Sequence, residues 1–144
     1  MNRVEDYIKC LNKFYNVADY ITINISSPNT ENLRNFHKEE EMNQLLSKVK
    51  EEKDKLKPDL PIAVKISPDI ENKSIEDICD ILANHSIDLL IISNTTEKNR
   101  EALKNINKLE KGGLSGKPVE KRSNELVKLF YKNLKNKIKI IGVG

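Results

Sequence analysis

Four short apolar runs interrupt a chain that is otherwise rich in charged residues. They are YITINI (20–25), PIAVKI (61–66), DLLIIS (88–93) and IKIIGVG (138–144). The runs are rich in Ile and Val and mostly lack the alternation of apolar and polar residues that a half-exposed strand shows. They therefore predict four β-strands that are covered on both faces.

The segments before and between these runs have the spacing of amphipathic helices. Residues 3–17 place apolar side chains on one stripe, and residues 38–56 are charged apart from a narrow apolar face. Ser74, with Asp77 three residues later, is close to a capping box and predicts the start of a third helix. A fourth helix is expected over 119–134, directly after a proline. The apolar positions are Val4, Tyr7, Ile8, Leu11 and Phe14; Met42, Leu45, Leu46 and Val49; Ile75, Ile78, Ile81 and Leu82; and Leu126, Val127 and Phe130.

The order of these elements predicts the fold class. A helix comes first, strands and helices then alternate, and a strand comes last, which is typical of a parallel sheet with right-handed crossovers. Periodicity does not distinguish a barrel from an open sheet. Four strands are half of an eight-stranded barrel, and the sequence stops at Gly144 directly after a strand. We therefore expect an excerpt of one α/β domain with two unpaired sheet edges.

The charges of the chain nearly cancel. There are 25 Lys and Arg residues and 22 Asp and Glu residues, which give a formal net charge of +3. This balance produces neither a strong field for nucleic acid nor a basic membrane-binding patch. The absence of Trp and the low aromatic content leave few side chains on which bases could stack. We therefore expect no nucleic-acid partner.

Cysteine and histidine residues are sparse. Cys10 and Cys79 both fall in expected helices, and His37 and His85 are isolated from each other. This spacing predicts neither a disulfide framework nor a metal site. No N-terminal stretch resembles a signal peptide, and no apolar run approaches the roughly 20 residues of a membrane-spanning helix. A cytoplasmic location is the default expectation.

Small, polar or cationic residues follow all four predicted strands, at the ends where parallel α/β proteins bind ligands. In chain order they are Asn24, Ser26, Ser27 and Asn29; Lys65, Ser67 and Pro68; Ser93, Asn94, Thr95 and Thr96; and Gly142 and Gly144. Because the carboxyl ends of parallel strands meet at one edge of the sheet, these groups predict a single site.

Two of these groups have a simpler interpretation. Ser, Asn and Pro after a strand are ordinary turn residues. Lys65 lies inside an apolar run, where its charge costs free energy unless it is paired or meets an anion. Alternatively, Lys65 lies at the end of the strand and extends its ammonium group to water. Both interpretations stay open at this point.

The glycine-rich segment KGGLSGKP (111–118) is not a Walker loop. That loop requires G-x-x-x-x-G-K-[ST]. Here Gly112 and Gly116 are one residue too close, Pro118 replaces the hydroxyl residue, and no strand leads directly into the segment. Gly113 and Gly116 nevertheless permit a close approach between the backbone and a ligand.

Five segments carry a family resemblance: NISSPNT, AVKISPD, ISNTT, GGLSGKP and IIGVG. In this order and spacing they resemble the quinone-reducing class of dihydroorotate dehydrogenase, over essentially the whole chain. One such motif would be weak, whereas five in register are specific. The family is an FMN-dependent (β/α)8 barrel that oxidises dihydroorotate to orotate in pyrimidine synthesis. The resemblance implies that residues 1–144 are the central half of this catalytic domain, a partial TIM barrel, with FMN as cofactor and quinone as electron acceptor.

The resemblance also implies roles for individual residues. Ser27 matches the catalytic base that removes the C5 proton of dihydroorotate, and a serine here points to the quinone class. Lys65 matches the lysine beside the flavin ring. The residues that match substrate-binding positions are Asn24, Asn29, Asn94 and Thr95. The residues that match FMN-binding positions are Asn24, Lys65, Ser93, Ser115, Gly116, Val143 and Gly144.

The chain departs from the family pattern in several places. It ends one glycine short of the family's GVGG, and Asn32 stands where the family usually has glycine. The earlier strands are absent, as are the N-terminal helices that form the quinone tunnel and meet the inner membrane.

These departures leave competing interpretations. Such a chain is active only if another chain supplies the missing half, as a complementing half-barrel or by self-association. The alternative is an inactive gene remnant that does not hold FMN tightly. Another FMN barrel with a different pyrimidine-like substrate is disfavoured by Ser27 and the three amides.

Overall fold

The computed structural model describes residues 3–101 and 103–143. The predicted strands and helices are all present. The helices are α1 (Arg3–Phe14), α2 (Glu39–Leu56), α3 (Ile75–Asn84) and α4 (Lys117–Leu134). The strands are β1 (Ile21–Asn24), β2 (Ile62–Lys65), β3 (Leu89–Ile92) and β4 (Lys139–Gly142). Short 3₁₀ helices lie in three of the connections, namely η1 (Leu33–His37), η2 (Asn72–Ser74) and η3 (Ile106–Leu109).

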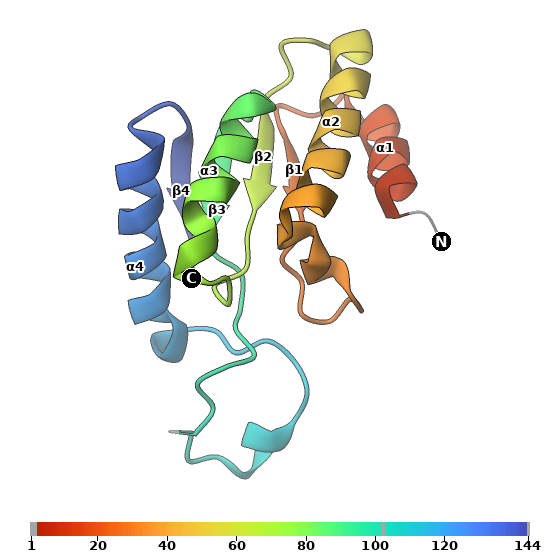
Figure 1. The fold of residues 1–144 in the computed structure, drawn as a ribbon. Helices are drawn as coiled ribbons and strands as arrows, with labels where there is room; N and C mark the ends of the chain where they lie inside the picture. Colours follow the sequence, from red (N-terminus) through yellow and green to blue (C-terminus); the bar gives the residue numbers. More distant parts are fainter. Residues whose placement is uncertain (1–2, 102, 144) are drawn as a thin grey trace.

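The four strands form one parallel sheet in the order β1-β2-β3-β4. The predicted α/β class, with parallel strands that alternate with helices, is therefore confirmed. All four helices lie on the same side of the sheet, in front of the strands in Figure 1. The layer order is thus one row of helices on one open sheet, with the carboxyl ends of all strands at the same edge.

The hydrophobic core lies between the sheet and the helices. Alternate strand residues point into it, because successive side chains of a strand point to opposite faces. In β2 and β3 these residues are Ile62, Val64, Leu90 and Ile92, each 2% exposed or less. Phe130 of α4 is fully buried against the same layer. Packing of this face therefore fixes how the strands lie beneath the helices.

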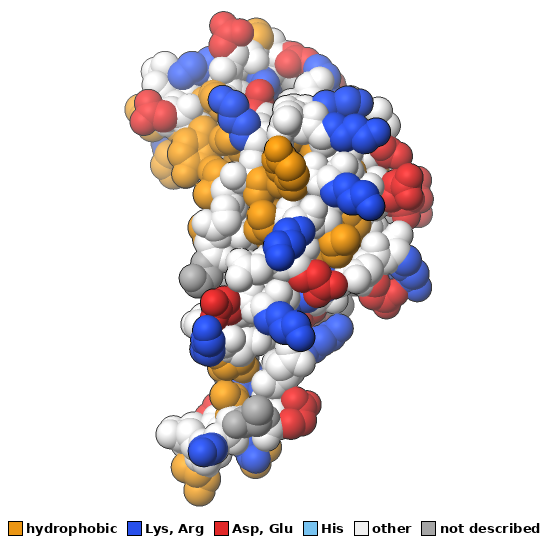
Figure 2. Space-filling model, turned by 90° about the vertical axis from the view of Figure 1, so that its left-hand side faces the viewer, with side chains coloured by type: hydrophobic (Ala, Val, Ile, Leu, Met, Phe, Trp, Pro, Cys, Tyr) orange, Lys and Arg blue, Asp and Glu red, His pale blue; other side chains and the backbone are white. Residues whose placement is uncertain are grey.

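The opposite face of the sheet, here called the helix-free face, carries the other alternate residues. Strand register places Thr22, Ala63, Leu89 and Lys139 in one row, and Asn24, Lys65, Ile91 and Ile141 in the next row toward the carboxyl ends. Seen from the α4 and β4 edge, hydrophobic side chains gather on the side of the molecule away from the helices (Figure 2). Helices thus cover only one of the two sheet faces that the sequence predicted to be covered.

The helix α3 begins directly after Ser74, as predicted, but two finer predictions are wrong. Ser74 does not cap α3 through its side chain, because its backbone already has helical angles (φ −88°, ψ −3°) at the end of η2. Phe14 is the last residue of α1 and is 54% exposed, so it lies outside the buried stripe of that helix.

Two further features of the helices are their limited apolarity and the two cysteines that they carry. Within the described part of the chain, no helix combines the length and the apolarity needed to cross a membrane. Cys10 on α1 is exposed and Cys79 on α3 is buried, and both are free thiols. Burial, with smaller contributions from nearby carboxylates, raises the pKa of the Cys79 thiol to about 12, so this cysteine stays protonated and unreactive.

Two adjacent leucines of β3 test the one-sided packing of the sheet. Leu90 is fully buried under the helices, whereas Leu89 is half-buried on the helix-free face. We expect Leu90→Ala to lower the free energy of unfolding by about 2–5 kcal/mol. Leu89→Ala removes less buried area and should cost only about 1 kcal/mol. Urea unfolding of both variants measures the difference, and equal losses would contradict the assignment of the two faces.

Candidate active site

Lys65 lies at the carboxyl end of β2, on the helix-free face, directly beside Asn24 of β1 in the sheet register. Its side chain is half-buried next to apolar Ile91 of β3. Among the described residues, the Lys65 ammonium group has no hydrogen bond or ion pair. A partly buried cation without a partner is stabilised when an anion binds beside it. The position of Lys65 therefore favours a bound anionic group over a purely structural role.

A buried serine joins two of the predicted substrate-binding amides. The Ser26 hydroxyl donates to Asn24 Oδ1 at 2.6 Å and accepts from Asn94 Nδ2 at 3.0 Å. Ser26 itself is fully buried. Asn94 Oδ1 in turn accepts the backbone N–H of Thr95 at 2.9 Å. The structure thus brings the ends of β1 and β3 together through side chains, and it gives Ser26, one of the strand-end residues, a role that the sequence had not assigned to it.

Ser27 lies in a compact turn after β1. Its hydroxyl oxygen accepts the backbone N–H of Asn29 at 3.2 Å, which is a side-chain turn of the kind that serine forms. Ser27 is half-buried and Asn29 is exposed. The turn interpretation of the SSPN segment is therefore correct for the backbone. This turn holds the Ser27 hydroxyl oxygen at the edge of the sheet where the four strands end.

Tyr7 of α1 fixes the end of β1 from the helical side. Its hydroxyl donates to the carbonyl oxygen of Asn24 at 2.7 Å, and its ring packs edge-on against Phe36 with centroids 5.9 Å apart. Burial raises the pKa of Tyr7 to about 12, so the hydroxyl keeps its proton and remains a donor. Tyr7 therefore holds the backbone of a predicted substrate-binding residue.

The glycine-rich loop packs directly against the end of β3. Leu114 and Thr96 exchange backbone hydrogen bonds of 2.7 and 2.9 Å. A Cβ atom added to Gly113 would lie 1.8 Å from Thr95 Oγ1 and 2.5 Å from Thr95 Cβ. Glycine is therefore required here by contact with Thr95. The close approach that the sequence predicted at Gly113 is made to the protein's own strand-end loop.

The start of α4 and the end of β4 enclose a second part of the site. A cavity of 450 Å³ is lined there by Gly116, Lys117, Glu120, Ser123, Asn124, Val127, Gly142 and Val143. The Ser93 hydroxyl approaches that of Ser123 at 3.4 Å, and the Ser93 N–H donates to Val143 O at 3.2 Å. Gly116, with φ +74°, directly precedes α4. Ser93, Gly116 and Val143 therefore lie together.

One predicted cofactor position is not joined to this group, and another cannot be placed. Ser115 is exposed, and among the described residues no hydrogen bond connects it to the other predicted positions. Gly144 lies outside the described residues. A chain of hydrogen bonds connects Asn24 to the α4 cavity through Ser26, Asn94, Ser93 and Ser123, so the predicted residues lie in two connected groups along one edge of the sheet.

Several residues at this edge were missed by the sequence analysis. Arg34, in η1, donates hydrogen bonds to Ser26 and Thr95 carbonyls and pairs with Asp69, which follows β2. Asp69 also accepts from the Thr96 hydroxyl. Charged residues in the loops after β1 and β2 were the available signal. Only the fold, however, shows that residues 35 positions apart meet.

Asn32 begins η1 in the left-handed conformation, with φ +55° and ψ +10°. Asparagine tolerates this region better than most residues, whereas glycine adopts it freely. Asn32 therefore adopts a backbone conformation that a glycine would also permit, and Arg34 follows two residues later.

His37 connects η1 to the end of β2. Its Nδ1 contacts the Arg34 carbonyl at 3.0 Å, and its Nε2 accepts the Ser67 backbone N–H at 3.1 Å. Because Nε2 accepts, the neutral ring carries its proton on Nδ1 and donates it to the carbonyl. Burial lowers the pKa of His37, opposed by this carbonyl and assisted by the Arg34 charge. Protonation of Nε2 would break the bond to Ser67.

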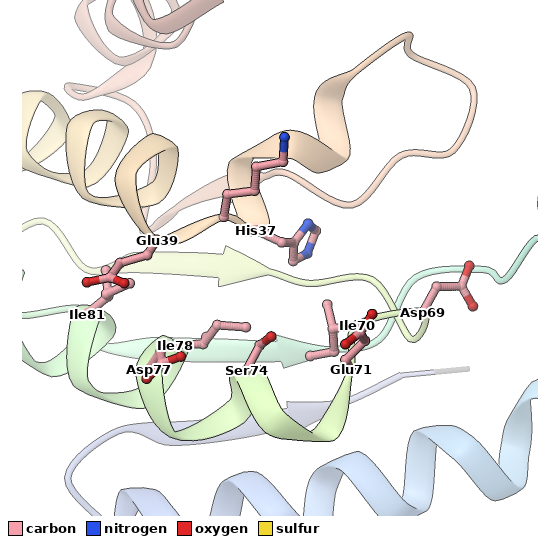
Figure 3. Close-up of a pocket in the computed structure, with 10 residues that line it drawn as sticks. His37, Glu39, Asp69, Ile70, Glu71, Ser74, Asp77, Ile78 and Ile81 are labelled. Carbon is pink, nitrogen blue, oxygen red and sulfur yellow. The ribbon is translucent and has the colours of Figure 1, made fainter.

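A cavity on the helical side of the sheet is less suited to an anion. Figure 3 shows it between η1 and the start of α2 on one side and α3 on the other, with a volume of 260 Å³. Its lining includes four carboxylates, from Glu39, Asp69, Glu71 and Asp77. A phosphate or a carboxylate ligand would be repelled there. The strand-end edge, with its unpaired Lys65, is therefore the better candidate.

Comparison with known proteins identifies relatives of the whole chain. The family model described as dihydroorotate dehydrogenase matches residues 1–144. A dihydroorotate dehydrogenase (quinone) from Wigglesworthia glossinidia brevipalpis is 46% identical over 144 residues, which cover 97% of this chain and 43% of the relative. The corresponding protein from Haemophilus ducreyi is 45% identical over 148 residues, covering 99% of this chain and 44% of the relative.

Solved structures show the same relationship. A crystal structure of DHODH from Eimeria tenella in complex with ferulenol superposes with a TM-score of 0.94 at 30% sequence identity. The match covers 100% of this chain and 43% of the Eimeria chain. The ligand-free form from the same organism gives a TM-score of 0.92. The chain thus spans less than half the length of the relatives that it matches.

Two glycines provide a matched test of the packing between the glycine-rich loop and β3. A Cβ at Gly113 would overlap Thr95, whereas nothing lies within 4 Å of a Cβ at Gly142. We expect Gly113→Ala to lower the free energy of unfolding by about 1–3 kcal/mol, because the backbone must shift. Gly142→Ala should change it by less than about 0.5 kcal/mol. Chemical denaturation measures both, and a tolerated Gly113→Ala would contradict the close contact.

The lowered pKa of His37 predicts a pH-dependent stability. The folded state disfavours the protonated ring, so the contribution of His37 is fully present above its ordinary pKa of 6.5. It is lost as the pH falls through the lowered folded-state value. His85, whose pKa is lowered by burial and then by Lys50, acts in the same direction.

Urea unfolding between about pH 8 and pH 5 measures this dependence. We expect His37→Gln to remove part of the loss of stability at low pH, since glutamine keeps a donor and an acceptor but does not titrate there. His85→Gln provides the comparison. A His37→Gln variant with the full wild-type pH dependence would show that the ring is not held neutral by the fold.

Proposed function

Because the chain belongs to the dihydroorotate dehydrogenase family, we propose that it is the central part of a flavin-dependent enzyme that oxidises dihydroorotate to orotate. By the naming of its relatives, quinone is the electron acceptor. The proposal treats residues 1–144 as part of a catalytic (β/α)8 barrel domain in pyrimidine biosynthesis. The chain spans 43% of the first of these relatives, so the complete reaction requires the remaining part of such a barrel.

Within residues 3–101 and 103–143 the ammonium group of Lys65 has no partner, and this observation carries the proposal. Lys65 lies on the helix-free face beside Asn24, at the edge where all four strands end. The nearby cation Arg34 is neutralised by Asp69 at 2.9 Å and Glu97 at 3.1 Å. Lys65, which has no ion-pair partner among the described residues, therefore supplies a positive charge for a bound ligand. That charge suits electron-rich groups such as a reduced flavin ring or a carboxylate.

The residues present fit FMN in two respects. Lys65 and Asn24 would lie beside its ring system, with the amide of Asn24 as a hydrogen-bonding group. Gly116 and Val143 line the cavity at the start of α4, Ser93 contacts its wall through Ser123, and the positive end of the α4 dipole favours a phosphate there. We propose Ser115 and Gly144 as further cofactor positions. Bound FMN would supply the two-electron acceptor for the oxidation.

The substrate positions are proposed around the amides of Asn24, Asn29 and Asn94, together with Thr95. Amide side chains offer both donors and acceptors, which suits the ring amides and the carboxylate of a dihydropyrimidine. The Ser26 hydroxyl already orients two of them, since it bonds Asn24 at 2.6 Å and Asn94 at 3.0 Å. A preformed set of this kind would bind the ring with little reorganisation.

Ser27 is proposed as the base that receives the C5 proton of dihydroorotate. Its oxygen accepts the Asn29 N–H, so the turn fixes where this oxygen lies while its own proton stays free to be passed on. Serine is a weak base at neutral pH, and it therefore needs this positioning and a further proton acceptor. The position of the base at the strand edge, close to the amide set, supports this role.

The helix-free face must be covered for such a site to work. Its central residues Ala63 and Ile91 are apolar, and the outer edges of β1 and β4 have no strand partner among the described residues. We propose that further strands complete the barrel, from a complementing half-barrel chain or from a second copy of this chain. Without this cover the FMN site is open to water. This exposure is the reason for the alternative interpretation, in which the chain is an inactive remnant that does not hold FMN tightly.

Two substitutions with opposite outcomes test the proposal. The chain is prepared together with the remaining strands of a related quinone enzyme, and FMN absorbance and dihydroorotate-dependent bleaching are followed. Lys65→Ala should weaken FMN binding about tenfold, because a charge-assisted contact is lost. Ser27→Ala should keep FMN bound but lower turnover by about 100-fold or more.

The outcomes separate the two interpretations. A completed wild-type preparation that binds no FMN would support the remnant. A Ser27→Ala variant with unchanged turnover would refute the assignment of the base while leaving the FMN site intact.

A further inference from the structure

One arginine side chain holds together the loops that follow three of the four strands. Arg34 donates to the Ser26 carbonyl at 3.2 Å through Nε and to the Thr95 carbonyl at 3.1 Å through Nη2. Through Nη1 it contacts Asp69 at 2.9 Å and Glu97 at 3.1 Å. These partners come from the loops after β1, β2 and β3.

Asp69 is the second centre of this contact set, here called the Arg34–Asp69 clasp. Its Oδ1 accepts from the Thr96 hydroxyl, and its Oδ2 accepts from Arg34 and from the Glu97 N–H at 3.1 Å. The side chains of Arg34 and Asp69 are only 22% and 12% exposed. Because both charges are largely removed from water, breaking the pair by removing one partner leaves the other poorly compensated.

The two carbonyls held by Arg34 lie on both sides of the proposed site. The Ser26 carbonyl belongs to the peptide unit that leads directly into Ser27, the proposed base. The Thr95 carbonyl belongs to a proposed substrate-binding residue, which Gly113 contacts from the other side. The planar fork of the guanidinium group therefore spans the gap between the base and the substrate-binding loop.

We propose that Arg34 is a positioning residue that sets the distance and orientation between Ser27 and Thr95, with Asp69 as its fixed counter-charge. This inference rests on the proposed function only in naming Ser27 and Thr95 as site residues. Arg34 acts through the backbone of its neighbours and not on the substrate, since its charge is already paired. Lysine cannot replace it, because a single ammonium group does not reach two carbonyls and a carboxylate in one plane.

Arg122 offers a matched control within the same chain. Its side chain is also 22% exposed, and it donates to the Pro68 carbonyl at 3.0 Å and to the Ile70 carbonyl at 2.6 Å. It pairs with Glu125 at 3.0 Å. These contacts hold the loop between β2 and α3 and involve neither Ser26 nor Thr95. A purely structural role for Arg34 would make the two arginines equivalent.

Amide resonances of the ¹⁵N-labelled full chain test the clasp directly. We expect Arg34→Lys to shift the amide signals of Ser27 and of residues 95–97, and to speed hydrogen exchange at Asn29 about tenfold. Arg122→Lys should shift residues 70–72 most, and should shift Ser27 and Thr95 much less than Arg34→Lys does, because Arg122 reaches the clasp only through the loop that carries Asp69. Unchanged Ser27 and Thr95 signals in Arg34→Lys, or equal shifts in Arg122→Lys, would overturn the proposal. If Arg34→Lys does not fold, Asp69→Asn is expected to shift the same signals, and the same criteria apply to it.

Turnover of dihydroorotate in the completed barrel provides the second readout. A displaced base should lower kcat about 100-fold in Arg34→Lys, with KM changed less than about threefold and FMN content unchanged. Arg122→Lys should keep the wild-type kcat. An unchanged kcat in Arg34→Lys would contradict the positioning role. A wild-type preparation without turnover would contradict the proposed function instead. In that case the amide resonances alone would test the role of the Arg34–Asp69 clasp.

Discussion

The parallel register of the four strands is the constraint on which the rest of the structure depends. It places every strand's carboxyl end at one edge, so that loops far apart in sequence meet there. Because the helices pack on one face only, alternate strand residues divide into two sets. One set is buried between the sheet and the helices, and the other lies on the helix-free face. Asn24 and Lys65 belong to the second set, and their position follows from register and alternation rather than from local sequence.

The charges at this edge are divided between structure and ligand. Arg34 is compensated by two carboxylates and holds the loops in place. Among the described residues, Lys65 has no such partner. Arg34 therefore stabilises the arrangement of the loops, whereas the charge of Lys65 is available to a bound ligand. The cavity between α2 and α3, which is lined by four carboxylates, has the opposite character, although it shares Asp69 with the strand-end edge (Figure 3).

Much of this arrangement could be predicted from the sequence, because it depends on local periodicity. The strands and helices follow from apolar spacing, and the resemblance to the family covers the segments at the strand ends. The clasp could not be predicted, since Arg34 and Asp69 meet only through the fold. Ser74 failed as a cap because η2 already continues into α3, which no spacing rule shows. Ser26 looked like a turn residue, and only its burial reveals the bond between two amides.

The central claim is that the edge formed by the strand ends binds flavin and substrate on the helix-free face. The most direct measurement is a titration of the completed barrel, in which only this chain is ¹⁵N-labelled, with FMN and orotate, followed by amide chemical shifts. We expect the largest changes at Asn24, Lys65 and Asn94, with a second group near Gly116. Changes confined to the lining of the acidic cavity, such as Glu39 and Asp77, or no changes at any concentration, would contradict the claim.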